Sequence, residues 1–332
     1  MAIDVQAILQ RQKTKPQHRD PLPKKSTPGK LLPFSFGASA LGWHQIQPFT
    51  ICPKEYQLAR VRRISRRSGF LKAPLSVGLL LHAARAQWFH DGFKGDLWRT
   101  AVVEYDRQHA EVDGKKLAPG SVPFATECFE AYVKHWSVRP KPTVLAVEHE
   151  IKPKALIAGA PQWAWRGARL DSMEKWKGKV WLGELKSTSS SPGRVHDLYR
   201  LNGQTLLQMA LWGEEETKEF GPLGGVLLDI IVKPSGKRGA RCSARIPLDL
   251  GSVDFALKWF RRDFTTWVMQ SSLIDWNTTV ERRPVCMRQY GPCEFQSLCL
   301  RGRNGSNGFV FEDGSPVSAW KPSEGKTTPP WE

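Results

Sequence analysis

The chain has 332 residues, of which 40% are hydrophobic, including 14 tryptophans, and its formal net charge is +17. This length holds one large domain or two average ones, and the apolar content is enough for a substantial core. The positive charge favours a polyanionic partner, with nucleic acid ahead of an anionic membrane. No apolar run is long enough to span a bilayer and no secretory signal is recognisable, so we expect a cytoplasmic protein without a membrane partner.

The two ends of the chain read as tails around a single domain over 36–302. Residues 1–35 are basic and rich in proline, and residues 303–332 are rich in Gly, Ser, Pro and Thr. Such composition predicts a disordered or loosely attached N-terminal tail and a flexible C-terminal one. The first part of the domain, 55–140, reads as mainly helical. Helices are predicted over Glu55–Arg67, Val77–Asp91 and Phe124–Trp136.

From residue 143 to about 270 the apolar pattern changes to that of strands alternating with helices. Three strands are predicted, then a helix, a strand buried on both faces, and a last helix. Their ranges are Thr143–Leu156, Ala164–Lys175, Lys179–Thr188, Tyr199–Glu216, Gly224–Lys233 and Asp254–Met269. With the helices before them, this order predicts an α/β domain in which helices flank a central mixed sheet, an αβββαβ core behind a helical N-terminal region.

The second and third strands form a predicted hairpin that brings two acids together. A turn at Lys177-Gly178 pairs Asp171 with Glu184, and directly opposed side chains have Cβ atoms roughly 4.5–5.5 Å apart. Lys186 lies two residues beyond Glu184, so it projects from the same face of the strand.

Two carboxylates at that distance repel each other unless a cation lies between them. Hard cations such as Mg²⁺ favour carboxylate and carbonyl ligands and can lower the pKa of an attacking water. The spacing alone also fits a surface hairpin with ordinary solvated charges, because this pattern has many accidental matches.

The wider pattern resembles the PD-(D/E)xK nuclease superfamily, in its RecB-like exonuclease branch. A helix-borne His82 in SVGLLLHAARAQW precedes Asp171 in RGARLDSM and the Glu184-Leu185-Lys186 segment of GELKST. Gln204 in NGQTLLQMALW then resembles the Q-x-x-x-Y helix of that branch.

The match at that helix has one departure from the family pattern. Gln208 stands where the family has an aromatic residue; if the motif begins at Gln208 instead, Trp212 takes the aromatic place.

This resemblance implies a restriction-endonuclease-like core and a role for each motif residue. His82, Asp171, Glu184 and the backbone carbonyl of Leu185 would bind Mg²⁺ or Mn²⁺. Lys186 would assist the attacking water, and Gln204 would position the substrate or the lysine. Glu148, on the first predicted strand, is either an auxiliary acid or an ordinary strand charge.

Four cysteines form a second candidate site. Cys286, Cys293 and Cys299 cluster late in the chain, and Cys52 lies ahead of the nuclease-like segment. Four thiolates suffice for a [4Fe–4S] cluster or a structural Zn²⁺. The arrangement resembles RecB-like nucleases of the AddB type, where one cysteine before the core and three after it hold an iron–sulfur cluster. Unrelated buried thiols are the remaining alternative.

Together these patterns predict a metal-dependent deoxyribonuclease, an exonuclease acting in recombination, repair or phage DNA processing. DNA is the expected partner, and a recombinase, a single-strand-binding protein or a helicase is the kind of protein partner that this function allows. A phage-encoded chain would act in the host cytoplasm. The alternatives are a catalytically inactive DNA-binding protein that retains the nuclease fold and a zinc-stapled structural protein.

Overall fold

The computed structural model describes most of the chain between residues 29 and 317. The described residues are 29–34, 41–66, 70–113, 116–156, 158–159, 165–274, 287–288, 291–301, 304, 306–311 and 315–317. Cys286 and most of the two predicted tails lie outside them. Within this part of the chain, no helix is both long and apolar enough to cross a membrane.

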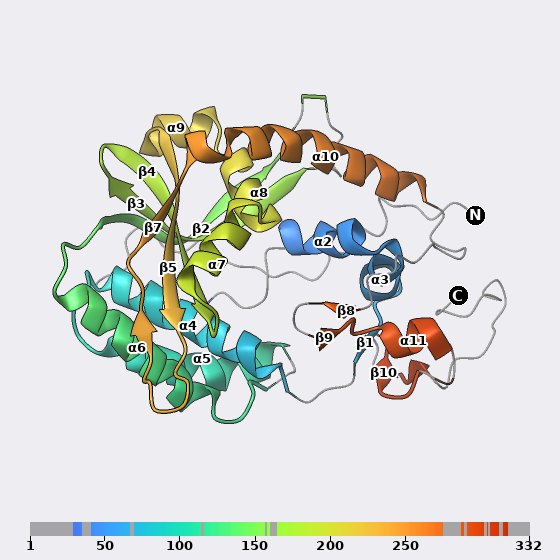
Figure 1. Ribbon diagram of the computed structural model, residues 1–332, viewed down its shortest axis with the longest axis horizontal. Coiled ribbons are helices and arrows are strands. Elements are labelled where there is room, and N and C mark those ends of the chain that lie inside the picture. Colours follow the sequence, from blue (N-terminus) through green and yellow to red (C-terminus); the bar gives the residue numbers. More distant parts are fainter. Residues whose placement is uncertain are drawn as a thin grey trace.

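The centre of the molecule is a mixed six-stranded sheet (Figure 1). Its strands are β2 (Thr143–Lys154), β3 (Arg166–Trp176), β4 (Lys179–Thr188), β5 (Leu223–Val232), β6 (Arg241–Cys242) and β7 (Ile246–Asp249). β2, β3 and β4 pair antiparallel, and β4 and β5 pair parallel. β6 and β7 both pair antiparallel with β5. The predicted α/β class and the mixed sheet are confirmed.

Helices cover both faces of this sheet, and each face has its own core. On one face α4 (Ala73–His90) and α6 (Ser121–Ser137) contact the strands, and α5 (Leu97–Asp113) packs against these two helices. On the other face α8 (Gly203–Leu211) contacts the strands, and α2 (Trp43–Ile51) and α10 (Asp254–Leu273) pack against α8. Several apolar side chains of α4 and α6, among them Leu80 and Phe129, are completely buried. Close packing of this kind holds α4 rigidly against the sheet.

The predicted helix over Tyr199–Glu216 is wrong, because that segment contains three short helices. They are α7 (Pro192–Arg200), α8 and α9 (Glu214–Phe220). Asn202 breaks the first helix, since its side chain accepts a hydrogen bond from the N–H of Gln204 and so caps the start of α8. The backbone N–H of Gly213 then donates to Oε2 of Glu216 at 2.9 Å, which caps the start of α9.

The hairpin between β3 and β4 has the predicted turn. Lys177 and Gly178 both have positive φ, 50° and 75°, as a tight hairpin turn requires. The ladder then runs from Trp176 opposite Lys179 to Ser172 opposite Gly183.

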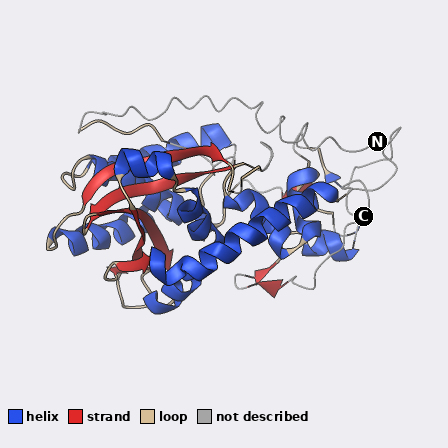
Figure 2. Cartoon of the chain, turned by 90° about the horizontal axis from the view of Figure 1, so that it is seen from above, coloured by secondary structure: helices blue, strands red, loops and turns tan. Residues whose placement is uncertain are grey.

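Segments from both ends of the described chain form a small third core beside the sheet domain. α3 (Pro53–Tyr56) leads into a π-helical turn, η1 (Gln57–Val61), and β1 (Ser65–Arg66) pairs with β10 (Phe309–Val310). α11 (Gln296–Arg301) and the pair β8 (Met287–Arg288) and β9 (Gly291–Pro292) complete this region. In both views these elements gather at one end of the molecule (Figures 1 and 2).

This third core differs from two expectations. The predicted helix over Glu55–Arg67 ends by Val61, and β1 follows it. Phe309 and Val317, from the predicted C-terminal tail, are buried against Leu58 and Ile64, so the described part of that tail packs onto the domain.

Candidate active site

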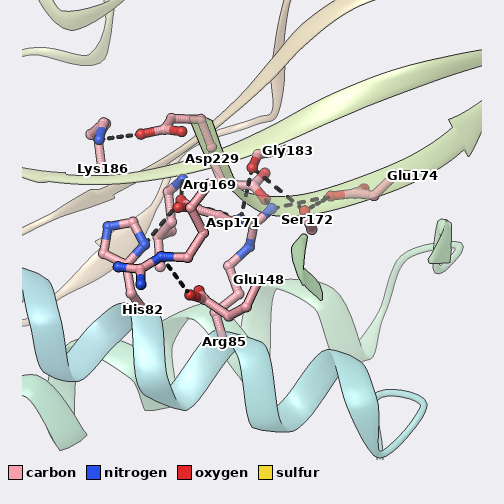
Figure 3. Close-up of polar contacts among 12 residues, drawn as sticks. His82, Arg85, Glu148, Arg169, Asp171, Ser172, Glu174, Gly183, Lys186 and Asp229 are labelled. Carbon is pink, nitrogen blue, oxygen red and sulfur yellow. Dashed lines mark hydrogen bonds and ion pairs between the residues drawn. The ribbon is translucent and has the colours of Figure 1, made fainter. Parts of the chain in front are cut away.

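The residues singled out by the motif meet at one place in the structure. His82 comes from α4, Asp171 from β3, Glu184 and Lys186 from β4, and Gln204 from α8. Figure 3 shows His82 and Arg85 pointing from α4 toward Asp171. The site therefore lies where α4 and α8 approach the β3–β4 hairpin.

His82 and Asp171 form one half of the site. Nδ1 of His82 lies 2.9 Å from Oδ2 of Asp171, and the backbone N–H of Leu185 donates to the same oxygen at 3.2 Å. Burial by itself lowers the pKa of His82, but the charge of Asp171 and the hydrogen bond to it raise that pKa above its usual value. Burial opposes ionisation of Asp171, yet His82, Lys186 and Arg85 hold its pKa well below the usual range. The pair is thus an ionised acid beside a readily protonated imidazole.

Glu184 and Lys186 form the other half. They make a close ion pair, and Glu184 also accepts from Nε2 of Gln204 at 3.3 Å and of Gln208 at 3.5 Å. Both glutamines that could begin the helix motif therefore reach the same carboxylate. Burial lowers the pKa of Lys186, but the charges of Glu184, Tyr199 and Asp171 raise it above its usual value, so this lysine is a cation at neutral pH.

Asp171 and Glu184 each lie one residue beyond the last paired residues of the hairpin, Ser172 and Gly183. The two carboxylates have different partners. Leu170 and Met173 pack into the same core cluster, whereas strict alternation would put them on opposite faces. The strand thus switches faces at Asp171–Ser172, and Asp171 turns toward α4. The charges of both acids act on Lys186, which is the cation that links them.

Glu148 lies opposite Asp171 on β2. The pairs on either side, Val147 with Ser172 and His149 with Leu170, set this register. Glu148 has a φ of 48°, a left-handed conformation that costs a non-glycine residue about 1 kcal/mol or more. Its Oε2 lies 3.2 Å from Nε of Arg169. Burial raises the pKa of Glu148 to about 7; the charge of Arg169 opposes this and that of Asp171 adds to it.

Behind the site, on the α4 side of the sheet, lies a buried charge network that sequence reasoning missed. Arg85 donates to the carbonyl of Gly183 at 3.2 Å and to Glu174 at 3.1 Å, and it approaches Asp229 at 3.4 Å. Arg245 pairs with both of these acids, and the hydroxyl of Tyr132 donates to Asp229 at 2.7 Å.

This network is tied to the site by Arg85, whose Nη1 is 3.8 Å from Oδ2 of Asp171. It therefore fixes α4 against β3, β4 and β5 and with it the position of His82. One sequence feature could have indicated this network: Arg85 lies one helical turn after His82, on the same face of the helix.

The chemistry of these donors fits Mg²⁺ or Mn²⁺, which favour carboxylate oxygens. Burial penalises Glu148 and Asp171 as anions, a penalty that a bound cation would relieve. In the described residues, no group of three or more His, Cys, Asp or Glu side chains is already gathered around one point. The reason is that each acid is turned toward a protein cation: Glu148 to Arg169, Asp171 to His82, and Glu184 to Lys186.

Three of the four candidate cluster ligands lie in the described chain. Cys293 and Cys299 belong to the third core, packed with Leu58 of the π-helical turn. Cys52 is buried five residues before that turn begins. The chain shortly after Cys52 therefore packs with the two later cysteines, but the three described cysteines are not gathered around one point. The bound group, iron–sulfur or zinc, stays a prediction, and Cys286 is outside the described residues.

Two comparisons with known proteins, one against family models and one against curated proteins, found no match for this chain. The predicted nuclease function therefore depends on the motif residues and their geometry.

Proposed function

We propose that this protein is a metal-dependent DNA nuclease of the RecB-like type, acting as an exonuclease in recombination, repair or phage DNA processing. The support for this proposal is that motif residues from four elements lie in contact. His82 contacts Asp171, and Glu184 contacts both Lys186 and Gln204. A surface hairpin with solvated charges would not place Glu184 at 2% exposure.

Each residue has a chemical role in this proposal. A divalent ion held by Asp171, Glu184 and His82 would supply a Lewis acid for the phosphate. Lys186, held as a cation, orients the attacking water and stabilises charge developing on the phosphate. Gln204 holds the carboxylate of Glu184 in place.

The surface beside the site supplies positive charge for a DNA backbone. β4 and β5 are parallel and pair Lys186 with Ile230, so the loop after β5 leaves the sheet at the same edge as the residues after Lys186. Lys237, Arg238 and Arg241 are exposed in that loop and at its end. The proposal includes action in the cytoplasm, or the host cytoplasm for a phage protein, where thiols stay reduced and open to metal.

The decisive experiment is cleavage of labelled linear DNA by the purified protein in Mg²⁺ or Mn²⁺. Lys186→Ala and Glu184→Ala are each expected to lower the rate by at least about 10²-fold, because each removes transition-state stabilisation. Lys179→Ala is the matched control, since Lys179 is exposed at the start of the same strand. Substrates that are single-stranded, blunt, 5′-labelled or 3′-labelled show which ends are used.

The same assay separates the alternatives. An inactive DNA-binding protein would bind DNA with an affinity that falls steeply with salt yet show no metal-dependent turnover. If Lys186→Ala and Glu184→Ala cleave as fast as the parent, the site assignment is wrong.

A further inference from the structure

Glu148 has a backbone conformation that is unusual for a charged residue within a strand. It lies in the middle of β2, opposite Asp171, with a φ of 48° where a strand residue normally has negative φ. Strain of this kind persists only where the surrounding structure enforces it, and it concentrates at functional sites.

The strained backbone directs the carboxylate inward. Ala146 and Ile151 contact the same core cluster although their spacing would put them on opposite faces of a regular strand. β2 therefore switches faces around Glu148, in step with the switch of β3 at Asp171. As a result two acids on neighbouring strands stand together at the site.

Arg169, the ion-pair partner of Glu148, also extends its side chain in an unexpected direction. Arg169 is paired in register with Glu150, an exposed residue of β2, and opposed charges on neighbouring strands form favourable pairs. Its guanidinium nevertheless extends to Glu148, where both side chains are 17% exposed. Arg169 thus carries a positive charge into the acidic site.

Of the protein cations at the site, Arg169 is the one whose printed ion pair is with Glu148. Lys186 neutralises a glutamate of its own strand, and His82 is fixed by the hydrogen bond to Asp171. Arg169 is 17% exposed, and long arginine side chains can extend their charged end toward water.

We propose that Glu148 is a further acidic ligand of the divalent-metal site and that Arg169 is its counter-ion until the metal displaces it. This rests on the proposed function for the identity of the site, and it adds a ligand and a competing cation that the motif does not contain. The arrangement explains why the acids are not already gathered around one point.

The test is Mn²⁺ binding by the metal-free full chain without DNA, followed by the loss of the free Mn²⁺ signal in electron paramagnetic resonance. Glu148→Gln is expected to weaken binding about tenfold or more, because it removes one charged ligand. Arg169→Gln is expected to tighten binding by about three- to tenfold, because it removes the competing cation. Glu150→Gln, the matched control on the same strand, leaves the affinity unchanged.

The opposite signs make the outcome decisive. A purely structural ion pair predicts that Glu148→Gln and Arg169→Gln weaken binding together or leave it alone, and either result overturns the proposal. Circular dichroism confirms that each variant is folded. If the parent chain binds no Mn²⁺, the proposed metal-dependent nuclease function is refuted. If the parent binds Mn²⁺ and Glu148→Gln binds it equally well, only the proposed role of Glu148 is refuted.

Discussion

At the scale of single residues, the site is a set of buried charges that neutralise one another. Glu148, Asp171 and Glu184 each face a protein cation. Buried charges of this kind are costly unless paired, and removal of one partner costs more than the pair contributes. A cation that enters the site must therefore compete with side chains already present, which makes metal affinity sensitive to each of them.

The raised pKa of Glu148 gives a pH dependence that can be measured. Its pKa is about 7 in the folded protein, against about 4.3 in an unfolded chain. The folded state therefore holds a proton between these values that the unfolded state has released, and stability falls as the pH rises through this window. This is the opposite sign from a carboxylate with a lowered pKa.

We expect the metal-free protein to lose on the order of 3 kcal/mol of unfolding free energy from this group across that window. Urea denaturation at several pH values between about pH 4 and pH 8 measures it. Glu148→Gln should reduce the slope, leaving the part that comes from the raised pKa of His82, and Glu150→Gln should keep the slope of the parent. An unchanged slope in Glu148→Gln would show that Glu148 titrates normally.

At the scale of elements, the site depends on how closely α4 lies against the β3–β4 hairpin. Gly183 is the residue that allows this approach. A Cβ there would overlap the carboxylate of Glu174 and the hydroxyl of Ser172, and would lie 2.6 Å from Nη2 of Arg85. Close packing therefore requires a glycine before the Glu-x-Lys segment, independently of backbone flexibility.

Gly183→Ala should destabilise the fold by about 3 kcal/mol, because the added methyl group must displace a fully buried ion network. Thermal unfolding followed by circular dichroism measures this. Gly193→Ala is the control, since its Cβ would meet no atom within 4 Å and it lies within α7, where alanine is the better helix former. Equal stability of the two variants would contradict the close packing of Arg85.

At the scale of the whole molecule, the third core joins segments from opposite ends of the described chain. β1 pairs with β10, and Phe295 and Leu298 pack against Leu58 and Ile64. A metal or cluster that joins Cys52 to the late cysteines would close a loop of most of the domain, which in the chain-entropy model contributes up to about 5 kcal/mol.

Anaerobically purified protein is expected to be brown, with iron and sulfide bound. Cys293→Ser should lose the colour and lower the thermal midpoint. Cys242 pairs with Ile231 of β5 and is far in sequence from the other candidate ligands, so Cys242→Ser should keep the colour. A colourless protein that contains zinc would favour the structural alternative. Colour retained in Cys293→Ser would remove that residue from the ligand set.

What the sequence by itself determined is local. β4 has the bounds that its alternation predicts, β5 lies within one residue of its prediction, and the Lys177-Gly178 turn sets the hairpin register. These features follow from residues within a few positions of one another, namely from apolar period, turn chemistry and the tolerance of glycine for positive φ.

Only the tertiary structure decided how the charges meet. Arg85 contacts Glu174 across 89 positions and Asp229 across 144, and no local pattern encodes such a choice of partner. The face switch at Glu148 and Asp171, and the division of one predicted helix into α7, α8 and α9, likewise depend on packing against other elements. Order along the chain could identify the motif residues, but burial and ion pairing determine which of them carry charge and which cations a bound metal would have to displace.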